Sequence, residues 1–164
     1  MKELYYPIAL KLKGRTALVV GGGQVAERKV KTLLRFGAHV YVVSPDLTAE
    51  LRRLFKSRRI IWFNRVAKPA DINSRDIVIL ATSDPSINKK LSRWAKRKGI
   101  LVNVVDRASL SSFISPAILF TPKAVVTVYT HALDPALSRD LKNFLKENWD
   151  VFLSYRRRLQ KRSA

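Results

Sequence analysis

The stretch TALVVGGGQVAERK, residues 16–29, decides the fold of this chain. An apolar run of β-forming residues leads directly into three glycines, which are followed by a segment with helical periodicity. Gly21 allows a sharp turn, and Gly23 allows the backbone to approach a ligand that a Cβ atom would block. Ala26 stands at the third position of the glycine fingerprint, where a small residue lets the helix pack close to the strand. Strand, turn and helix N-terminus together predict a binding site for the pyrophosphate of a dinucleotide.

Length and composition limit the class of protein. The chain has 164 residues, which corresponds to one domain or to one domain with a small addition. It has no cysteine, so disulfides and thiolate metal sites are excluded, and we expect no metal site. The N-terminus lacks the apolar segment of a secretory signal, and no apolar run is long enough to cross a bilayer. We therefore expect a cytoplasmic protein without membrane contact.

The charge is strongly positive. Lys and Arg number 32 against 12 Asp and Glu, which gives a formal net charge of +20 at pH 7. Such a charge attracts polyanions: nucleic acid, anionic lipid, or a small ligand with several carboxylates or phosphates. The cations are spread along the chain, and no nucleic-acid-binding module is recognisable. We therefore do not expect nucleic acid as a partner, and a solvated basic surface is the simplest interpretation.

Strand and helix patterns alternate up to Asp106. The predicted strands are residues 17–20, 39–43, 60–63, 76–81 and 101–105, and the predicted helices are residues 25–36, 47–56 and 84–98. This alternation predicts an α/β fold with a Rossmann-like parallel sheet and helices on both faces. Two apolar runs, 117–120 and 124–129, flank a proline turn and predict an antiparallel β-hairpin.

One amphipathic helix is predicted from Pro135 onward, with Trp149, Phe152 and Leu153 continuing its apolar side. We assign residues 1–112 to a dinucleotide-binding domain and residues 113–164 to a dimerisation and substrate segment. A hairpin and one helix bury little core alone, so this segment is expected to pack on a second subunit.

Five segments of the chain resemble the dehydrogenase and ferrochelatase domain of sirohaem synthases, that is, precorrin-2 dehydrogenase. They are YPIALKLKG (6–14), VGGGQVAERK (20–29), ATSDPSIN (81–88), VNVVD (102–106) and FISPA (113–117). The R-K continuation of the glycine fingerprint is more specific than a general dinucleotide motif. Order and spacing agree over about residues 4–145, which is nearly the whole chain.

The resemblance implies NAD-dependent oxidation of the tetrapyrrole precorrin-2 to sirohydrochlorin, and in some members also the insertion of ferrous iron. It further implies a homodimer, and it makes Asp106, the aspartate of the N-V-V-D motif, the catalytic residue. The residues themselves are compatible with this role, because Asp106 follows a strand of a parallel sheet, where such folds bind ligands. A carboxylate there can accept a proton, although an aspartate in a plain turn is the alternative interpretation.

For the cofactor we expect NAD, held by the glycine turn and by the ends of neighbouring strands. The candidate cofactor-binding residues are Gly21, Gly23, Gln24, Val25, Ala26, Ser44, Pro45, Asp46, Thr82 and Asn103. Arg52 and Arg53 leave a 2′-phosphate, and hence NADP, open. Asp46 is equally well explained as a helix N-cap, with Glu50 completing the turn.

Thr130 and His131 are the candidate substrate-binding residues. They lie in the segment THALDP, residues 130–135, where the family has a loop rich in serine and glycine. This departure, together with the short region after Pro135, favours an alternative function: a non-catalytic partner protein of haem biosynthesis that binds NAD or a tetrapyrrole. Under either function the positive charge suits a ligand rich in carboxylates.

Overall fold

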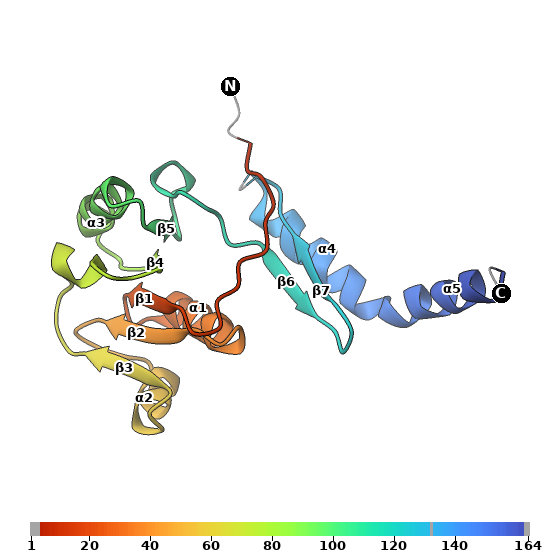
Figure 1. Ribbon diagram of the computed structural model, residues 1–164, viewed down its shortest axis with the longest axis horizontal. Coiled ribbons are helices and arrows are strands. Elements are labelled where there is room, and N and C mark those ends of the chain that lie inside the picture. Colours follow the sequence, from red (N-terminus) through yellow and green to blue (C-terminus); the bar gives the residue numbers. More distant parts are fainter. Residues whose placement is uncertain (1–3, 132, 163–164) are drawn as a thin grey trace. The chain divides into compact units, whose positions relative to one another are not determined.

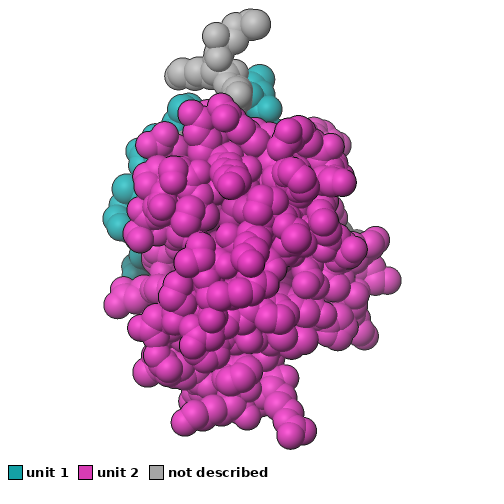
Figure 2. All heavy atoms as spheres, turned by 90° about the vertical axis from the view of Figure 1, so that its left-hand side faces the viewer, with its two compact units in different colours: residues 1–5, 114–164 teal, residues 6–113 magenta. Residues whose placement is uncertain are grey.

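The computed structural model describes residues 4–131 and 133–162, and it divides the chain into two compact units (Figures 1 and 2). The first unit spans residues 6–113, and the second contains the described residues up to Tyr5 and from Ile114 onward. The division drawn from the sequence placed Tyr5 in the first unit and Phe113 in the second. Two hydrogen bonds explain the difference at Tyr5: the Tyr129 hydroxyl donates to the Tyr5 carbonyl at 3.1 Å, and the Tyr5 N–H donates to His131 Nδ1 at 3.3 Å.

The first unit contains a five-stranded sheet in the order β3-β2-β1-β4-β5, and all four strand pairs are parallel. Its strands are β1 (Thr16–Val20), β2 (His39–Val43), β3 (Ile60–Phe63), β4 (Ile77–Leu80) and β5 (Leu101–Val104). The chain adds β2 and β3 on one side of β1 and then crosses over to add β4 and β5 on the other side. The predicted Rossmann-like fold is therefore confirmed, with its topological switch point between β1 and β4.

Helices cover both faces of the sheet (Figure 1). They are α1 (Gln24–Arg35), α2 (Ala49–Lys56) and α3 (Pro85–Arg97), with short 3₁₀ turns η1 (Pro69–Ile72) and η2 (Ala108–Leu110). Successive residues of β1 point to opposite faces, so Val19 packs with the core under α1 and α2, whereas Leu18 packs with the core under α3 and η1. A strand buried on both faces reads as one apolar run.

Helix starts differ slightly from the sequence prediction. α2 begins at Ala49 rather than Leu47, and its N-cap is Thr48, whose hydroxyl accepts the Leu51 N–H at 3.2 Å. The interpretation of Asp46 as an N-cap is therefore wrong. α3 begins after Asp84, as predicted, because one carboxylate oxygen accepts the N–H groups of Ser86 and Ile87.

The second unit contains the predicted hairpin, formed by the antiparallel strands β6 (Ala117–Phe120) and β7 (Val125–Val128), and two helices. The prediction of one helix from Pro135 is wrong, because α4 (Pro135–Glu147) and α5 (Trp149–Arg162) are separate. The break lies at Asn148, whose side-chain amide and backbone N–H both donate to the Phe144 carbonyl, at 2.9 and 3.0 Å. Within the described ranges, no helix is long and apolar enough to cross a membrane.

Candidate functional site

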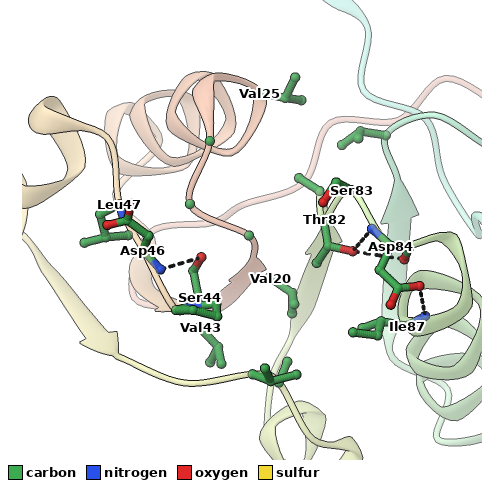
Figure 3. Close-up of a pocket in the computed structure, with 18 of the residues that line it drawn as sticks. Val20, Val25, Val43, Ser44, Asp46, Leu47, Thr82, Ser83, Asp84 and Ile87 are labelled. Atoms are coloured by element: carbon green, nitrogen blue, oxygen red, sulfur yellow. Dashed lines mark hydrogen bonds between the residues drawn. The ribbon is translucent and has the colours of Figure 1, made fainter.

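The glycine loop, residues 21–23, joins β1 to α1 at the centre of the site (Figure 3). Gly21 has φ +118°, and a Cβ atom there would lie 2.4 Å from the Ala81 carbonyl oxygen. A Cβ atom on Gly22 would lie only 1.8 Å from the Asp46 carbonyl oxygen, whereas one on Gly23 would meet no atom within 4 Å. Packing inside the protein thus requires Gly21 and Gly22, while Gly23 faces open space that a ligand can enter.

The N-terminus of α1 is available to an anion. Gly23 is its N-cap, so no side chain satisfies the first N–H groups of the helix, and the positive end of the helix dipole lies at the same place. The nearby Glu27 carboxylate is engaged elsewhere, since it accepts Lys31 Nζ and the Thr48 hydroxyl, each at 2.7 Å. These two bonds lower the pKa of Glu27, and they join α1 to the start of α2.

The end of β2 presents one acidic and one basic side chain. The carboxylate of Asp46, which is 78% exposed, accepts the Leu47 N–H at 2.8 Å and pairs with the Arg52 guanidinium. Arg52 Nε also donates to the Leu47 carbonyl, at 3.2 Å. The buried Ser44 lies beside them, and its hydroxyl accepts the Asp46 N–H at 3.4 Å. This is where Rossmann folds bind the ribose of a dinucleotide.

The end of β4 is fixed by a buried amide. Asn88 is 1% exposed and lies on α3, and its Nδ2 donates to the Thr82 carbonyl at 3.1 Å. The Thr82 hydroxyl donates to Asn88 Oδ1 at 2.8 Å and accepts the Asp84 N–H at 3.2 Å. Bonds from the Ser86 hydroxyl and from the N–H groups of Ile87 and Ser86 hold the pKa of Asp84 below its ordinary value. Asp84 therefore remains an anionic cap on α3.

The two candidates from the N-V-V-D motif have different surroundings. Asp106 is exposed and follows β5 at the carboxyl edge of the sheet. Asn103 is 6% exposed within β5, and its Nδ2 donates to the Phe113 carbonyl at 3.1 Å. Its Oδ1 is buried and has no hydrogen-bond partner in the part of the chain that the structure describes.

These strand ends surround one cavity of about 770 Å³ (Figure 3). In Figure 3, Ser44 and Asp46 lie on one side of the glycine loop, and Thr82 and Asp84 lie on the other. Nine of the predicted residues line the cavity: Gly21, Gly23, Gln24, Val25, Ser44, Pro45, Asp46, Thr82 and Asp106. Ala26 and Asn103 do not line it. The described residues of the lining include three aspartates, with no lysine or arginine.

Thr130 and His131 belong to the second unit, where both make local contacts. The Thr130 hydroxyl donates to the Asp134 carbonyl at 2.7 Å and accepts the Asp134 N–H at 3.1 Å, which fixes the start of α4. His131 has φ +51°, lies edge-on to Tyr129 at 4.9 Å between ring centroids, and uses Nδ1 to accept the Tyr5 N–H. Their proposed contact with substrate stays a prediction.

Sequence reasoning missed several residues that shape the cavity. Gly22, Thr48 and the segment Val66–Ala67 all line it, and Asn88 holds one of its walls from outside. The run of three glycines was a signal for Gly22, because a sharp turn by itself does not require three consecutive glycines. Thr48 is a good N-cap residue only one position from the helix start, and no comparable signal marks Val66–Ala67.

The site fits a dinucleotide. The open space beside Gly23 and the uncapped start of α1 suit a pyrophosphate, and the exposed carboxylate at the end of β2 suits ribose hydroxyls. Apolar side chains such as Val20, Val43 and Ile87 supply walls for the rings. Among the described residues, no group of three or more His, Cys, Asp or Glu side chains can hold a metal ion.

Comparisons with known proteins agree with this geometry. Residues 8–117 match a family model described as "Putative NAD(P)-binding". The chain is 36% identical over 149 residues to the siroheme synthase of Baumannia cicadellinicola subsp. Homalodisca coagulata, covering 91% of this chain and 32% of that protein. It is 42% identical over 139 residues to the siroheme synthase of Nitrosomonas eutropha, covering 84% of this chain and 29% of that protein. The chain thus spans about a third of the length of these relatives.

Among solved structures, SirC, a precorrin-2 dehydrogenase, aligns with a TM-score of 0.77 and 28% sequence identity over 88% of this chain and 71% of that chain. This similarity extends beyond the NAD(P)-binding match, which ends at residue 117. A nicotinamide dinucleotide is therefore the cofactor of this chain. The chain belongs to the NAD(P)-binding family that the model describes, and its domain is of the type that siroheme synthases contain.

Proposed function

We propose that this chain is a dehydrogenase that oxidises precorrin-2 to sirohydrochlorin with NAD⁺ as the hydride acceptor. One observation carries the proposal: the exposed Asp106 carboxylate lines the same cavity as the glycine loop. The similarity to SirC supports it, since that protein is a precorrin-2 dehydrogenase. Asp46 supports a preference for NAD⁺, because an exposed carboxylate at the end of β2 suits ribose hydroxyls, although Arg52 pairs with it there.

The residues of this chain have separable tasks in the proposed reaction. Bound NAD⁺ supplies the acceptor for a hydride that leaves the macrocycle. The N–H groups at the start of α1 bind the pyrophosphate, while Thr82, fixed by Asn88, shapes the opposite wall. Asp106 accepts the proton that the macrocycle loses on oxidation, acting as a general base at the rim.

An anaerobic absorbance assay tests this function directly. Purified protein is mixed with precorrin-2 and NAD⁺, and formation of NADH and of sirohydrochlorin is followed. We expect turnover by the wild-type chain and a loss of about 100-fold or more in kcat for Asp106→Asn, with unchanged affinity for NAD⁺. Asp84→Asn is a matched control, because Asp84 also lines the cavity but caps α3. Equal turnover by wild type and Asp106→Asn would remove Asp106 from the mechanism.

A second function is favoured by one observation, the altered segment 130–135. Thr130 and Asp134 bond to each other, and His131 bonds to Tyr5, so this loop is committed to local structure. A non-catalytic protein that binds NAD and a tetrapyrrole would bind both ligands in the same assay without forming NADH. Adding ferrous or cobaltous ion to the sirohydrochlorin product tests the chelatase activity that the family resemblance implies.

We also propose that the second unit forms a homodimer. Leu137, Leu141 and Phe144 recur along α4 at helical spacing, and they are 54%, 43% and 59% exposed. A row of exposed apolar residues on one helix face requires a partner surface in a stable protein. Sedimentation velocity at increasing protein concentration tests this, and a monomer at all concentrations would contradict it.

A further inference from the structure

The outer face of α3 carries an unusual concentration of positive charge. Its exposed residues Lys89, Lys90, Arg93, Lys96 and Arg97, together with Ser86, are the described residues that line a hollow of about 680 Å³. The residues from Ser86 to Arg97 extend over about 16 Å of helix at 1.5 Å per residue. We call this surface the α3 basic face.

The α3 basic face conflicts with the stability of its own helix. Arg93 has cations at both i−3 and i−4 and at both i+3 and i+4, and such like-charge neighbours destabilise a helix. α3 contains no Asp or Glu, whereas α1 pairs Glu27 with Lys31 and α2 pairs Glu50 with Arg53. In the described part of the chain, the cations of the α3 basic face form no ion pair. Local conflicts of this kind are expected where a surface serves a ligand.

Two features connect this face to the dinucleotide cavity. The first turn of α3 borders both, because Asp84 and Ile87 line the cavity and Ser86 lines the hollow. The described lining of the cavity contains three aspartates and no cation, and Arg52, the cation beside it, is already paired with Asp46. A substrate with several carboxylates therefore needs cations outside the cavity, and the α3 basic face offers five along the helix that starts at the cavity. Of these, Lys96 Nζ also donates to the Ser109 carbonyl at 3.3 Å, and Arg97 lies over the Trp94 ring at 5.2 Å.

We propose that the α3 basic face captures a polycarboxylate substrate and delivers it to the cavity at the first turn of α3. This inference rests on the proposed function and adds the surface that binds the substrate carboxylates. An amphipathic membrane helix would need exposed apolar residues, and α3 has no large exposed apolar side chain. Electrostatic capture of this kind raises association rates by about 10- to 1000-fold, and salt weakens it strongly.

The test compares two variants that each remove three charges. The triple variant Lys89→Gln/Arg93→Gln/Lys96→Gln alters the α3 basic face, and Lys56→Gln/Arg58→Gln/Arg59→Gln is the matched control. The control cations are exposed and precede β3, so they lie near the opposite edge of the sheet. Fluorescence titration with uroporphyrin, a non-reacting polycarboxylate tetrapyrrole, measures capture without catalysis, and kcat/KM with precorrin-2 measures delivery.

At low salt we expect the α3 variant to bind uroporphyrin about tenfold more weakly and to lose about tenfold in kcat/KM, with kcat and the affinity for NAD⁺ unchanged. The difference should shrink as salt approaches about 0.15 M, where the Debye length is about 8 Å. The control variant should behave as wild type. Equal losses of uroporphyrin affinity in the two variants would show that only the net charge matters, and the proposal would be wrong. An α3 variant with wild-type affinity and kcat/KM would also overturn the proposal.

Two further outcomes are decisive. If the α3 variant loses affinity for a single-stranded oligonucleotide but not for uroporphyrin, the face binds phosphate backbones and the proposal is wrong. If wild-type protein forms no NADH from precorrin-2 while uroporphyrin binding still depends on α3, the proposed function fails. In that case the face binds anions but does not deliver a substrate. If the wild-type protein oxidises precorrin-2 and the α3 variant does so with the same kcat/KM at low salt, only the inference about the α3 basic face is wrong.

Discussion

Replacing Gly22 or Gly23 by alanine should separate folding from cofactor binding. A Cβ atom on residue 22 would lie 1.8 Å from the Asp46 carbonyl oxygen, which must retreat by at least 1.2 Å to reach a contact of 3.0 Å. That movement also strains the 3.0 Å hydrogen bond from the Thr48 N–H to the Gly22 carbonyl. Overpacking and a weakened hydrogen bond together cost about 3 kcal/mol, which lowers Tm by about 10 °C.

Gly23→Ala should leave the stability nearly unchanged and weaken the binding of NAD⁺. Its Cβ atom meets no protein atom within 4 Å, so Tm should change by less than about 4 °C. The added methyl group occupies the space where the pyrophosphate approaches α1, and the affinity for NAD⁺ should fall about tenfold or more, about 1.4 kcal/mol. Thermal unfolding followed by circular dichroism and calorimetric titration with NAD⁺ measure the two quantities. Wild-type stability of Gly22→Ala, or wild-type NAD⁺ affinity of Gly23→Ala, would refute the corresponding argument.

Two other substitutions test hydrogen bonds made by side chains outside the cavity lining. Asn88→Ala leaves the Thr82 carbonyl and hydroxyl without their buried partners, so unfolding free energy should fall by about 1–3 kcal/mol and NAD⁺ affinity should fall with it, as measured by denaturant titration and calorimetry. Asp71, which accepts Arg65 at 2.5 and 2.8 Å and the Lys68 N–H at 2.7 Å, has a lowered pKa, chiefly through Arg65. Its stabilising effect is therefore present above its ordinary pKa of about 3.9 and is lost as pH falls through the lowered value. Asp71→Asn should be less stable at neutral pH and should show a flatter loss of stability on acidification; an unchanged acid limb would exclude Asp71 as a contributor.

The sequence predicted the sheet well because its signals are local. A strand buried on both faces is a continuous apolar run, and three glycines before an amphipathic segment have few structural interpretations. Strand ends along one edge of a parallel sheet come together regardless of loop detail, which is why Ser44, Thr82 and Asp106 share a cavity. The wrong predictions concern where helices begin and end, which depends on the path of the backbone.

The start of α2 and the end of α4 are two examples. Asp46 and Thr48 are both good N-caps, and only the backbone path decides that Thr48 takes the role while Asp46 turns to Arg52. Asn148 is the C-cap of α4, but the apolar pattern continues past it without a change of period, so the pattern predicted one helix where there are two. Asn103 illustrates a third limit: its place inside β5, rather than beyond its end, keeps it out of the cavity lining.

The charges of the cavity bear on how this protein separates two anionic ligands. A pyrophosphate can bind N–H groups at a helix start without any cation, because those donors are directional and close. Carboxylates spread over a large macrocycle cannot all reach such donors, and near Asp84 and Asp106 they meet charges of their own sign. A cavity whose described lining has no cation therefore suits the dinucleotide better than a polycarboxylate. Asp106 lies on that cavity as an exposed side chain, so the function that we propose has the reacting groups of the two ligands meet at the boundary between backbone donors and surface cations.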